Sequence, residues 1–258
     1  MEYEKLLLHI LTKATARPNQ RRLRRDERKA QRVVDAGFIT QTKYTIKESN
    51  KLLGKKSVKS LNNDIDDIFN DLPSKKMNTG VLLVSSSSMK FGADYQIKKS
   101  KLAQFGISFD LKHSNAVQYL QTDRPLVLAK MSQTAKDHIK PLIVNAVKTG
   151  QSPQELAKLI SKNYAFSRER SLMISVNEIG NAYEVGNFAP IQDAQNEGID
   201  MQKSWLTVGD GKVTPSHTEN QKEGWVEVDH TFTGTGDKLA PATDNPRCRC
   251  TILYQVKK

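Results

Sequence analysis

The sequence predicts an α+β protein with a mainly helical N-terminal arm and body and a small β-rich C-terminal domain. Apolar residues recur at helical spacings over much of the first 198 residues. After Gly198, apolar and polar residues alternate instead, and Gly, Pro, Thr and Trp become more frequent. Only 37% of the residues are hydrophobic and the mean hydropathy is −0.58. These values indicate helical or elongated parts with much exposed surface.

Changes in composition divide the chain into three parts. Its 258 residues are enough to bury a core, as one large domain or two modest ones. We expect a basic helical arm over 1–72, a linker or irregular segment over 73–105, and a C-terminal domain over 106–258. In that last domain, helices are expected over 106–198 and a β-rich unit over 201–258.

The arm shows helical spacing in two stretches. The first covers 2–36 and is interrupted near Arg17-Pro18, because proline disfavours a helical conformation in the residue before it. The second covers 42–71, where Leu, Ile and Phe recur at helical spacings. The following stretch, 81–101, contains four consecutive serines and shows no clear period, so we assign it no secondary structure.

Helical patterns return after residue 106. Two stretches, 107–121 and 124–150, are predicted to be helices. Ser152, Pro153 and Glu155 then form a complete helix start, with an N-cap, a proline at the first helical position and an acidic residue at the third.

The pattern changes again beyond a long helix expected over 167–198. Alternation predicts strands over 201–208, 224–232 and 247–256. The sequence "GDGK" at 209–212 indicates a turn between the first two strands.

Positive charge is concentrated in the first quarter of the chain. The formal net charge is +12, and residues 1–60 hold 16 Lys and Arg against 6 Asp and Glu, a net of +10. Six arginines recur there at helical spacings, and five of them share one helix face. The six are Arg21, Arg22, Arg24, Arg25, Arg28 and Arg32. This face is a solvated surface, a contact for nucleic-acid phosphates or a contact for an acidic protein.

The two cysteines of the chain, Cys248 and Cys250, are separated by one residue. On an extended strand their Cα atoms would lie roughly 6.5–7 Å apart, from the strand rise per residue. That separation is at the edge of relaxed disulfide geometry, so a disulfide between them is disfavoured. Three roles stay open: packing thiols in the core, zinc ligands, or a Cys–His nucleophile pair with His217.

The cysteines and nearby histidines make zinc the candidate cofactor. Thiolate and imidazole ligands suit its tetrahedral coordination, which makes Cys248, Cys250, His217 and His230 candidate ligands. The usual structural zinc pattern, however, leaves two to four residues between paired cysteines. No Gly-rich phosphate loop, HExxH motif or nucleophile elbow occurs in the sequence, so no motif indicates an enzyme.

Two features bear on the compartment in which the chain is made. No stretch approaches the roughly 20 apolar residues of a membrane span, so we expect no membrane association at synthesis. Two cysteines without a disulfide framework fit a reducing compartment, and the first 20 residues do not read as a secretory signal. We therefore expect synthesis in the cytoplasm.

The order of motifs in the C-terminal part resembles the phage Mu protein F-like family of head morphogenesis, or minor head, proteins. The resemblance covers about 106–253 and rests on "SPQELAKLI", "VNEIGNAYEVGN", "GDGKVTPSH" and the closing "NPRCRC". The residues that match the family motif are Trp205, Asp210, His217, Asn245, Cys248, Arg249 and Cys250.

The resemblance implies a non-enzymatic minor head protein, present in few copies inside the procapsid. It implies association with the portal protein, the capsid interior and packaged double-stranded DNA, and a role in head assembly, DNA packaging or ejection. The chain would be located in the virion after assembly in the host cytoplasm. Some members of the family join this domain to toxin enzymes. The alternatives are a standalone nucleic-acid-binding protein, a Cys/His-dependent enzyme or a toxin-related domain.

Overall fold

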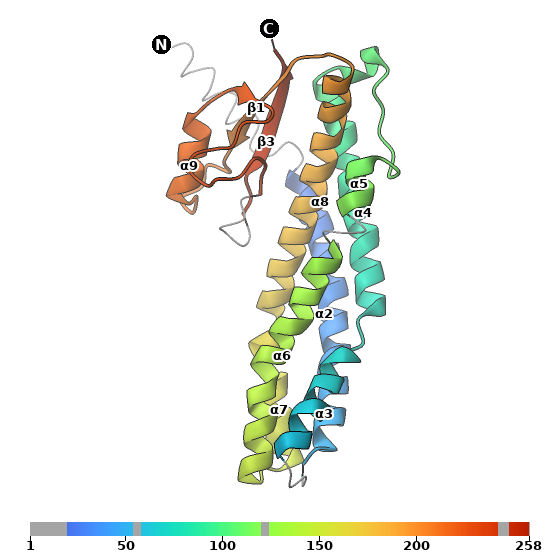
Figure 1. Ribbon diagram of the computed structural model, residues 1–258, viewed down its shortest axis with the longest axis vertical. Helices are drawn as coiled ribbons and strands as arrows, with labels where there is room; N and C mark the ends of the chain where they lie inside the picture. The colour runs from blue at the N-terminus through green and yellow to red at the C-terminus, as the bar shows by residue number, and fades with distance from the viewer. Residues whose placement is uncertain (1–19, 54–57, 120–123, 242–247, 258) are drawn as a thin grey trace. The chain divides into compact units, whose positions relative to one another are not determined.

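The computed structural model describes residues 20–53, 58–119, 124–241 and 248–257 (Figure 1). The chain is mainly helical and carries one small antiparallel sheet near its C-terminus, which confirms the predicted fold class. The helices are α2 (Gln20–Asn50), α3 (Val58–Asn70), α4 (Lys75–Lys99), η1 (Leu102–Phe105), α5 (Ser114–Gln118), α6 (Arg124–Thr149), α7 (Pro153–Ser161), η3 (Tyr164–Phe166), α8 (Arg168–Asn196) and α9 (Pro215–Lys222). The strands are β1 (Met201–Leu206), β2 (Val226–Glu227) and β3 (Thr251–Val256).

The chain folds into two compact units, each assembled from segments that are distant in the sequence. The first unit comprises Met1–Glu27, Val84–Tyr119 and Val176–Lys258, and the second comprises Arg28–Leu83 and Leu120–Ser175. The long helices α2, α4 and α8 contribute residues to both units. These boundaries do not coincide with the three consecutive segments that composition indicates, and those segments stay a prediction.

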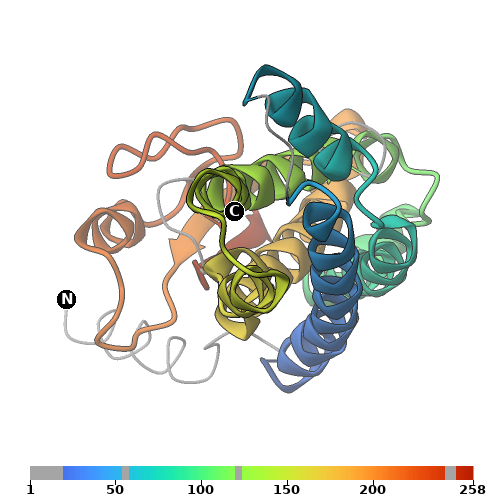
Figure 2. The same ribbon diagram turned by 90° about the horizontal axis from the view of Figure 1, so that it is seen from below.

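The second unit has a core of α3, α6, α7 and η3 (Figure 2). Ile65 of α3, Ile139 of α6 and Leu156 of α7 are fully buried there. Ser152 and Glu155 form the predicted capping box: the Glu155 N–H donates to Ser152 Oγ at 3.3 Å, and the Ser152 N–H donates to Glu155 Oε2 at 2.8 Å. The box fixes where α7 begins and so directs its apolar face towards α6.

The predicted irregular segment over 73–105 is wrong in its secondary structure, because α4 runs through the serine run. Ser85 and Ser88 are fully buried, in the same stripe as Val81 and Met89. Small hydroxyl side chains can line a buried helix face where their hydrogen bonds are met, and Ser88 donates to Asp26 Oδ2 at 3.3 Å. The helical period was hidden because polar serines occupy core positions.

Two further helix predictions need correction. In the stretch 107–121, whose described part ends at residue 119, α5 starts only at Ser114. Ile107 and Phe109 are buried outside any helix, and Asp110 accepts a hydrogen bond from the Lys112 N–H at 2.6 Å, which forms a local turn. The helix predicted over 42–71 is two helices, since α2 ends at Asn50 and α3 starts at Val58. The predicted interruption at Pro18 lies outside the described residues.

The first unit contains the three-stranded sheet, in the order β2-β1-β3 with both pairs antiparallel (Figure 1). Trp205 pairs with Ile252 across β1 and β3. Both side chains are buried, together with Phe232 and Tyr254, in a core completed by Ile191 of α8. The predicted region therefore contains a small sheet, which packs on the C-terminal part of α8.

Parts of this unit differ from the alternation pattern. The strand predicted over 224–232 is reduced to the two residues of β2, and β3 begins at Thr251, so both cysteines precede the strand. Pro215–Lys222 forms α9, a helix after the turn at 209–212 that the sequence pattern did not predict. Pro215 occupies the first turn of this helix, where its missing N–H costs nothing. Within the described ranges, no helix has the length and hydropathy needed to cross a membrane.

Candidate functional site

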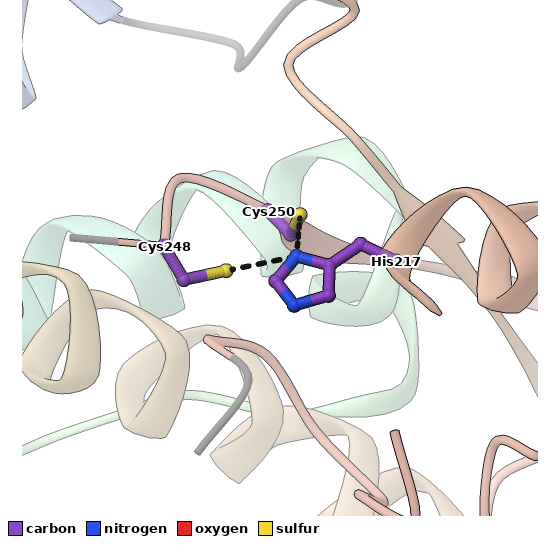
Figure 3. Close-up of side chains that lie close together, drawn as sticks. All are labelled: His217, Cys248 and Cys250. Atoms are coloured by element: carbon purple, nitrogen blue, oxygen red, sulfur yellow. Dashed lines mark hydrogen bonds between the residues drawn. The ribbon is translucent and has the colours of Figure 1, made fainter. Parts of the chain in front are cut away.

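Three buried side chains of the first unit converge on one point (Figure 3). The Nδ1 atom of His217 lies 3.4 Å from the sulfur of Cys250 and 3.7 Å from the sulfur of Cys248. The side chains of His217, Cys250 and Cys248 are 2%, 3% and 5% exposed, and neither cysteine is in a disulfide. We call these residues the His–Cys–Cys cluster.

The cluster is held in place by α9 and by the segment that leads into β3. His217 lies in the first turn of α9, where its N–H donates to the Thr214 carbonyl at 3.1 Å. Its ring packs edge-on against Trp205 of β1, with ring centroids 5.8 Å apart. Cys250 directly precedes Thr251, which pairs with Leu206 of the same strand. The sheet therefore aligns two segments about thirty residues apart in sequence.

A pocket of about 400 Å³ opens beside the cluster. Arg249 donates a hydrogen bond from Nη2 to Asp210 Oδ2 at its rim, and this hydrogen bond lowers the pKa of the Asp210 carboxyl below its ordinary value. The Lys212 N–H also donates to Asp210, at 3.1 Å. The pocket is lined by Val176, Val208, Asp210, Lys212, Val213, Thr214, His217, Cys248, Arg249 and Cys250.

Most residues of the predicted family motif meet at this pocket. Asp210, His217, Cys248, Arg249 and Cys250 all line it, and Trp205 packs on the histidine. Asn245 lies outside the described residues.

His230, the fourth predicted zinc ligand, is not part of the cluster. Its Nε2 atom lies 2.6 Å from Glu223 Oε2, and its ring stands perpendicular to Phe232. Three of the four predicted ligands therefore come together, and they are two thiols and one imidazole that could hold a metal ion.

Sequence reasoning missed the polar residues of α8 that position β3. Glu184 is buried and accepts hydrogen bonds from the Thr251 hydroxyl and, at 3.4 Å, from the Ile252 N–H. Asn187 donates from Nδ2 to the Ile252 carbonyl at 3.0 Å. Both residues belong to "VNEIGNAYEVGN", so the polar residues within that apolar helix were the available signal.

The six predicted phosphate-contacting arginines all lie in α2. Five are exposed on the face opposite the buried Leu23, Ala30 and Val34; they are Arg21, Arg24, Arg25, Arg28 and Arg32. We call these five residues the arginine face of α2.

Arg22 is only partly exposed and contacts side chains of both α2 and α4. It donates to Asp26 Oδ2 and to the Ser87 hydroxyl, both at 3.0 Å, and its guanidinium lies 5.3 Å from the centre of the Phe91 ring. These contacts make it a packing residue between α2 and α4.

Comparison with known proteins shows that the part of the chain that contains this site is similar to a family. Residues 137–253, which run from the middle of α6 to the middle of β3, match the family described as Phage Mu protein F like protein. The match therefore includes both segments of the His–Cys–Cys cluster and the α8 residues that hold β3.

A curated relative is the NAD(+)–arginine ADP-ribosyltransferase EFV of Enterococcus faecalis, 25% identical over 190 residues. The alignment covers 63% of this chain and 38% of the relative, so the chain spans less than two-fifths of that protein's length. No solved structure matches the chain. Residues 137–253 of the chain, somewhat less than half of its length, are thus similar to the phage Mu protein F-like family.

Proposed function

We propose that the chain is a minor head protein of a bacteriophage, which associates with the portal and with packaged DNA inside the virion. The observation that carries this proposal is the family match over 137–253, which includes α8, β1, β2, the first half of β3 and the His–Cys–Cys cluster. Head assembly, DNA packaging or ejection is the process in which such a protein would act.

The proposed DNA contact is the arginine face of α2. Its five guanidinium groups are exposed, and they stand on the side of the helix opposite its buried residues. No aromatic residue lies between Arg21 and Arg32, so the face is suited to phosphates rather than to stacking on bases. Contact with phosphate carries no sequence preference, as packaging of a whole genome requires.

The head assignment is tested by quantitative mass spectrometry of gradient-purified procapsids and full heads from the phage or prophage that encodes this chain. We expect the protein in both particles, at a few copies per portal. Crosslinking in the same particles would identify the portal as its neighbour. Recovery of the chain only in the soluble fraction of the lysate would contradict the proposal and favour a standalone nucleic-acid-binding protein.

The DNA contact is tested by the salt dependence of duplex binding. Each lost phosphate contact reduces the slope of log affinity against log salt by about 0.9, so replacing all five arginines by Gln should reduce it by about 4 to 5 if each contacts one phosphate. A matched control replaces five exposed cations elsewhere, namely Lys75, Lys76, Lys158, Lys162 and Arg168. Equal slopes for the two variants would reject the arginine face as the DNA contact.

We also propose that the chain acts without enzymatic turnover. The activity in the name of the E. faecalis relative belongs to a protein of which this chain matches 38%. The test incubates the purified chain with labelled NAD⁺ and an arginine-containing acceptor protein. Transfer of label above that of a heat-denatured sample would overturn this part of the proposal.

A further inference from the structure

We propose that the His–Cys–Cys cluster binds one zinc ion, with a fourth coordination position that opens to the pocket beside it. The proposal concerns the chemistry of three side chains in the first unit and does not depend on the role of the chain in the head. It assigns the cysteine pair a function that differs from core packing and from nucleophilic catalysis.

The spacing of the three ligand atoms fits tetrahedral zinc. With Zn–S bonds of about 2.3 Å and Zn–N bonds of about 2.0–2.1 Å, a tetrahedron places sulfur and nitrogen about 3.6 Å apart. The observed separations from His217 Nδ1 are 3.4 Å to Cys250 and 3.7 Å to Cys248. All three atoms lie within 4.8 Å of one another, so one ion can reach them together.

Hydrogen bonding alone accounts poorly for this arrangement. An imidazole nitrogen has either one proton or one lone pair, so Nδ1 can form one good hydrogen bond. Two sulfurs nevertheless approach the same nitrogen (Figure 3). A metal ion at their centre accepts a lone pair from each of the three atoms. Two thiolates with one imidazole also favour zinc over magnesium or calcium, which prefer oxygen ligands.

Arg249, the single residue between the cysteines, points away from the cluster and anchors the segment that carries both of them. Cys248 and Cys250 are both buried in the cluster, whereas Arg249 is partly exposed and bonds to Asp210. Successive side chains of an extended segment point to opposite sides, so both sulfurs face one side and the guanidinium faces the other. The Asp210–Arg249 pair anchors the segment, which limits how far either sulfur can move from the histidine.

Three side chains that could bind a metal ion converge at this point within the described part of the chain. Structural zinc sites usually have four protein ligands, whereas a site with three protein ligands keeps one position for water. The pocket of about 400 Å³ is lined by all three side chains and has room for a water molecule. We therefore assign the fourth position to water.

The first test is metal content and ligand identity in the wild-type chain, purified under reducing conditions without chelators. We expect about one zinc per chain by elemental analysis. X-ray absorption should show two sulfur neighbours at about 2.3 Å and two nitrogen or oxygen neighbours at about 2.0–2.1 Å. This measurement needs no substitution, so it cannot fail through misfolding.

The second test uses Cys250→Ser, His217→Ala and the control His138→Ala, a substitution at an exposed histidine of α6. The two cluster variants should lose zinc, and the control should keep it. Cobalt substitution of the wild type should give a thiolate-to-cobalt charge-transfer band and the visible spectrum of a tetrahedral site. A chain that takes up neither zinc nor cobalt, or zinc with no sulfur neighbours, would overturn the proposal and leave the cysteines as packing thiols.

Discussion

Lys203 is a charged residue that forms part of the protein core. It lies in β1, its side chain is fully buried, and its Nζ atom donates to the carbonyl oxygens of His230 at 2.6 Å and Lys238 at 2.7 Å. The ammonium also lies 5.0 Å from the centre of the Phe232 ring. One side chain thus holds two points of the segment that follows β2, and the alternation of residue types in β1 did not predict this role.

The pKa of Lys203 makes this role testable. Burial, and then repulsion by Lys238, lower the pKa of its ammonium from 10.5 to about 8. The folded state therefore releases this proton more readily than the unfolded state. Stability contributed by this group increases as the pH rises from about 8 to 10.5 and is lowest below pH 8.

We expect Lys203→Met to lose about 1–3 kcal/mol of unfolding free energy at neutral pH, because two carbonyls lose their donor. The difference from wild type should widen between pH 8 and pH 10, since methionine does not titrate. Urea unfolding at several pH values measures both effects. Lys238→Gln, an exposed change that keeps both carbonyls, should cost less than about 0.5 kcal/mol. A difference that stays constant with pH would mean that Lys203 keeps an ordinary pKa.

At the scale of elements, the close approach of α4 and α8 is set by two glycines in the first unit. A Cβ atom on Gly186 would lie 1.8 Å from the Met89 carbonyl oxygen, and one on Gly92 would lie 2.2 Å from the Tyr183 carbonyl oxygen. Backbone, not a flexible side chain, occupies both positions. Only glycine therefore allows the two helices to pack at this distance.

Gly186→Ala should destabilise the protein by about 3 kcal/mol or more, the upper end of the cost of overpacking a core, because two backbones must separate. Gly180→Ala is the matched control in the same helix: an added Cβ meets no atom within 4 Å, so it should be neutral or stabilise by up to about 1 kcal/mol through helix propensity. Thermal unfolding of both variants decides the matter. Similar melting temperatures would contradict the close packing of α4 on α8.

An element could be predicted when the residues that determine it are close together in the sequence, and not when it depends on contacts between distant segments. The start of α7 was predictable because Ser152, Pro153 and Glu155 are local signals. The helix α4 was not, because Ser85 and Ser88 are polar residues that long-range packing places in a core. The proximity of His217 to the cysteines depends on the pairing of β1 with β3, and the separation of His230 depends on its bond to Glu223. Neither the proximity of His217 nor the separation of His230 can be predicted from the spacing of these residues in the sequence.

At the scale of the whole molecule, the net positive charge and the match to the family model lie in different parts of the chain. Residues 1–60 carry a net charge of +10 out of +12, whereas the family match begins at residue 137. The proposed DNA contact and the part that defines the family are therefore separable by substitution. Substitutions in the arginine face can therefore test which of two partners it binds, DNA or an acidic head protein.

The decisive experiment complements a phage that lacks this gene with the chain in which the five arginines of the arginine face are replaced by Gln. If the face contacts DNA, the variant should enter heads at the wild-type copy number, because the family part is unchanged, while DNA packaging or ejection is impaired. The five-charge control variant should restore both functions. If the face binds an acidic head protein instead, the variant should be missing from procapsids that contain no DNA. Copy number in empty procapsids therefore separates the two partners, because only the protein contact can act before DNA enters.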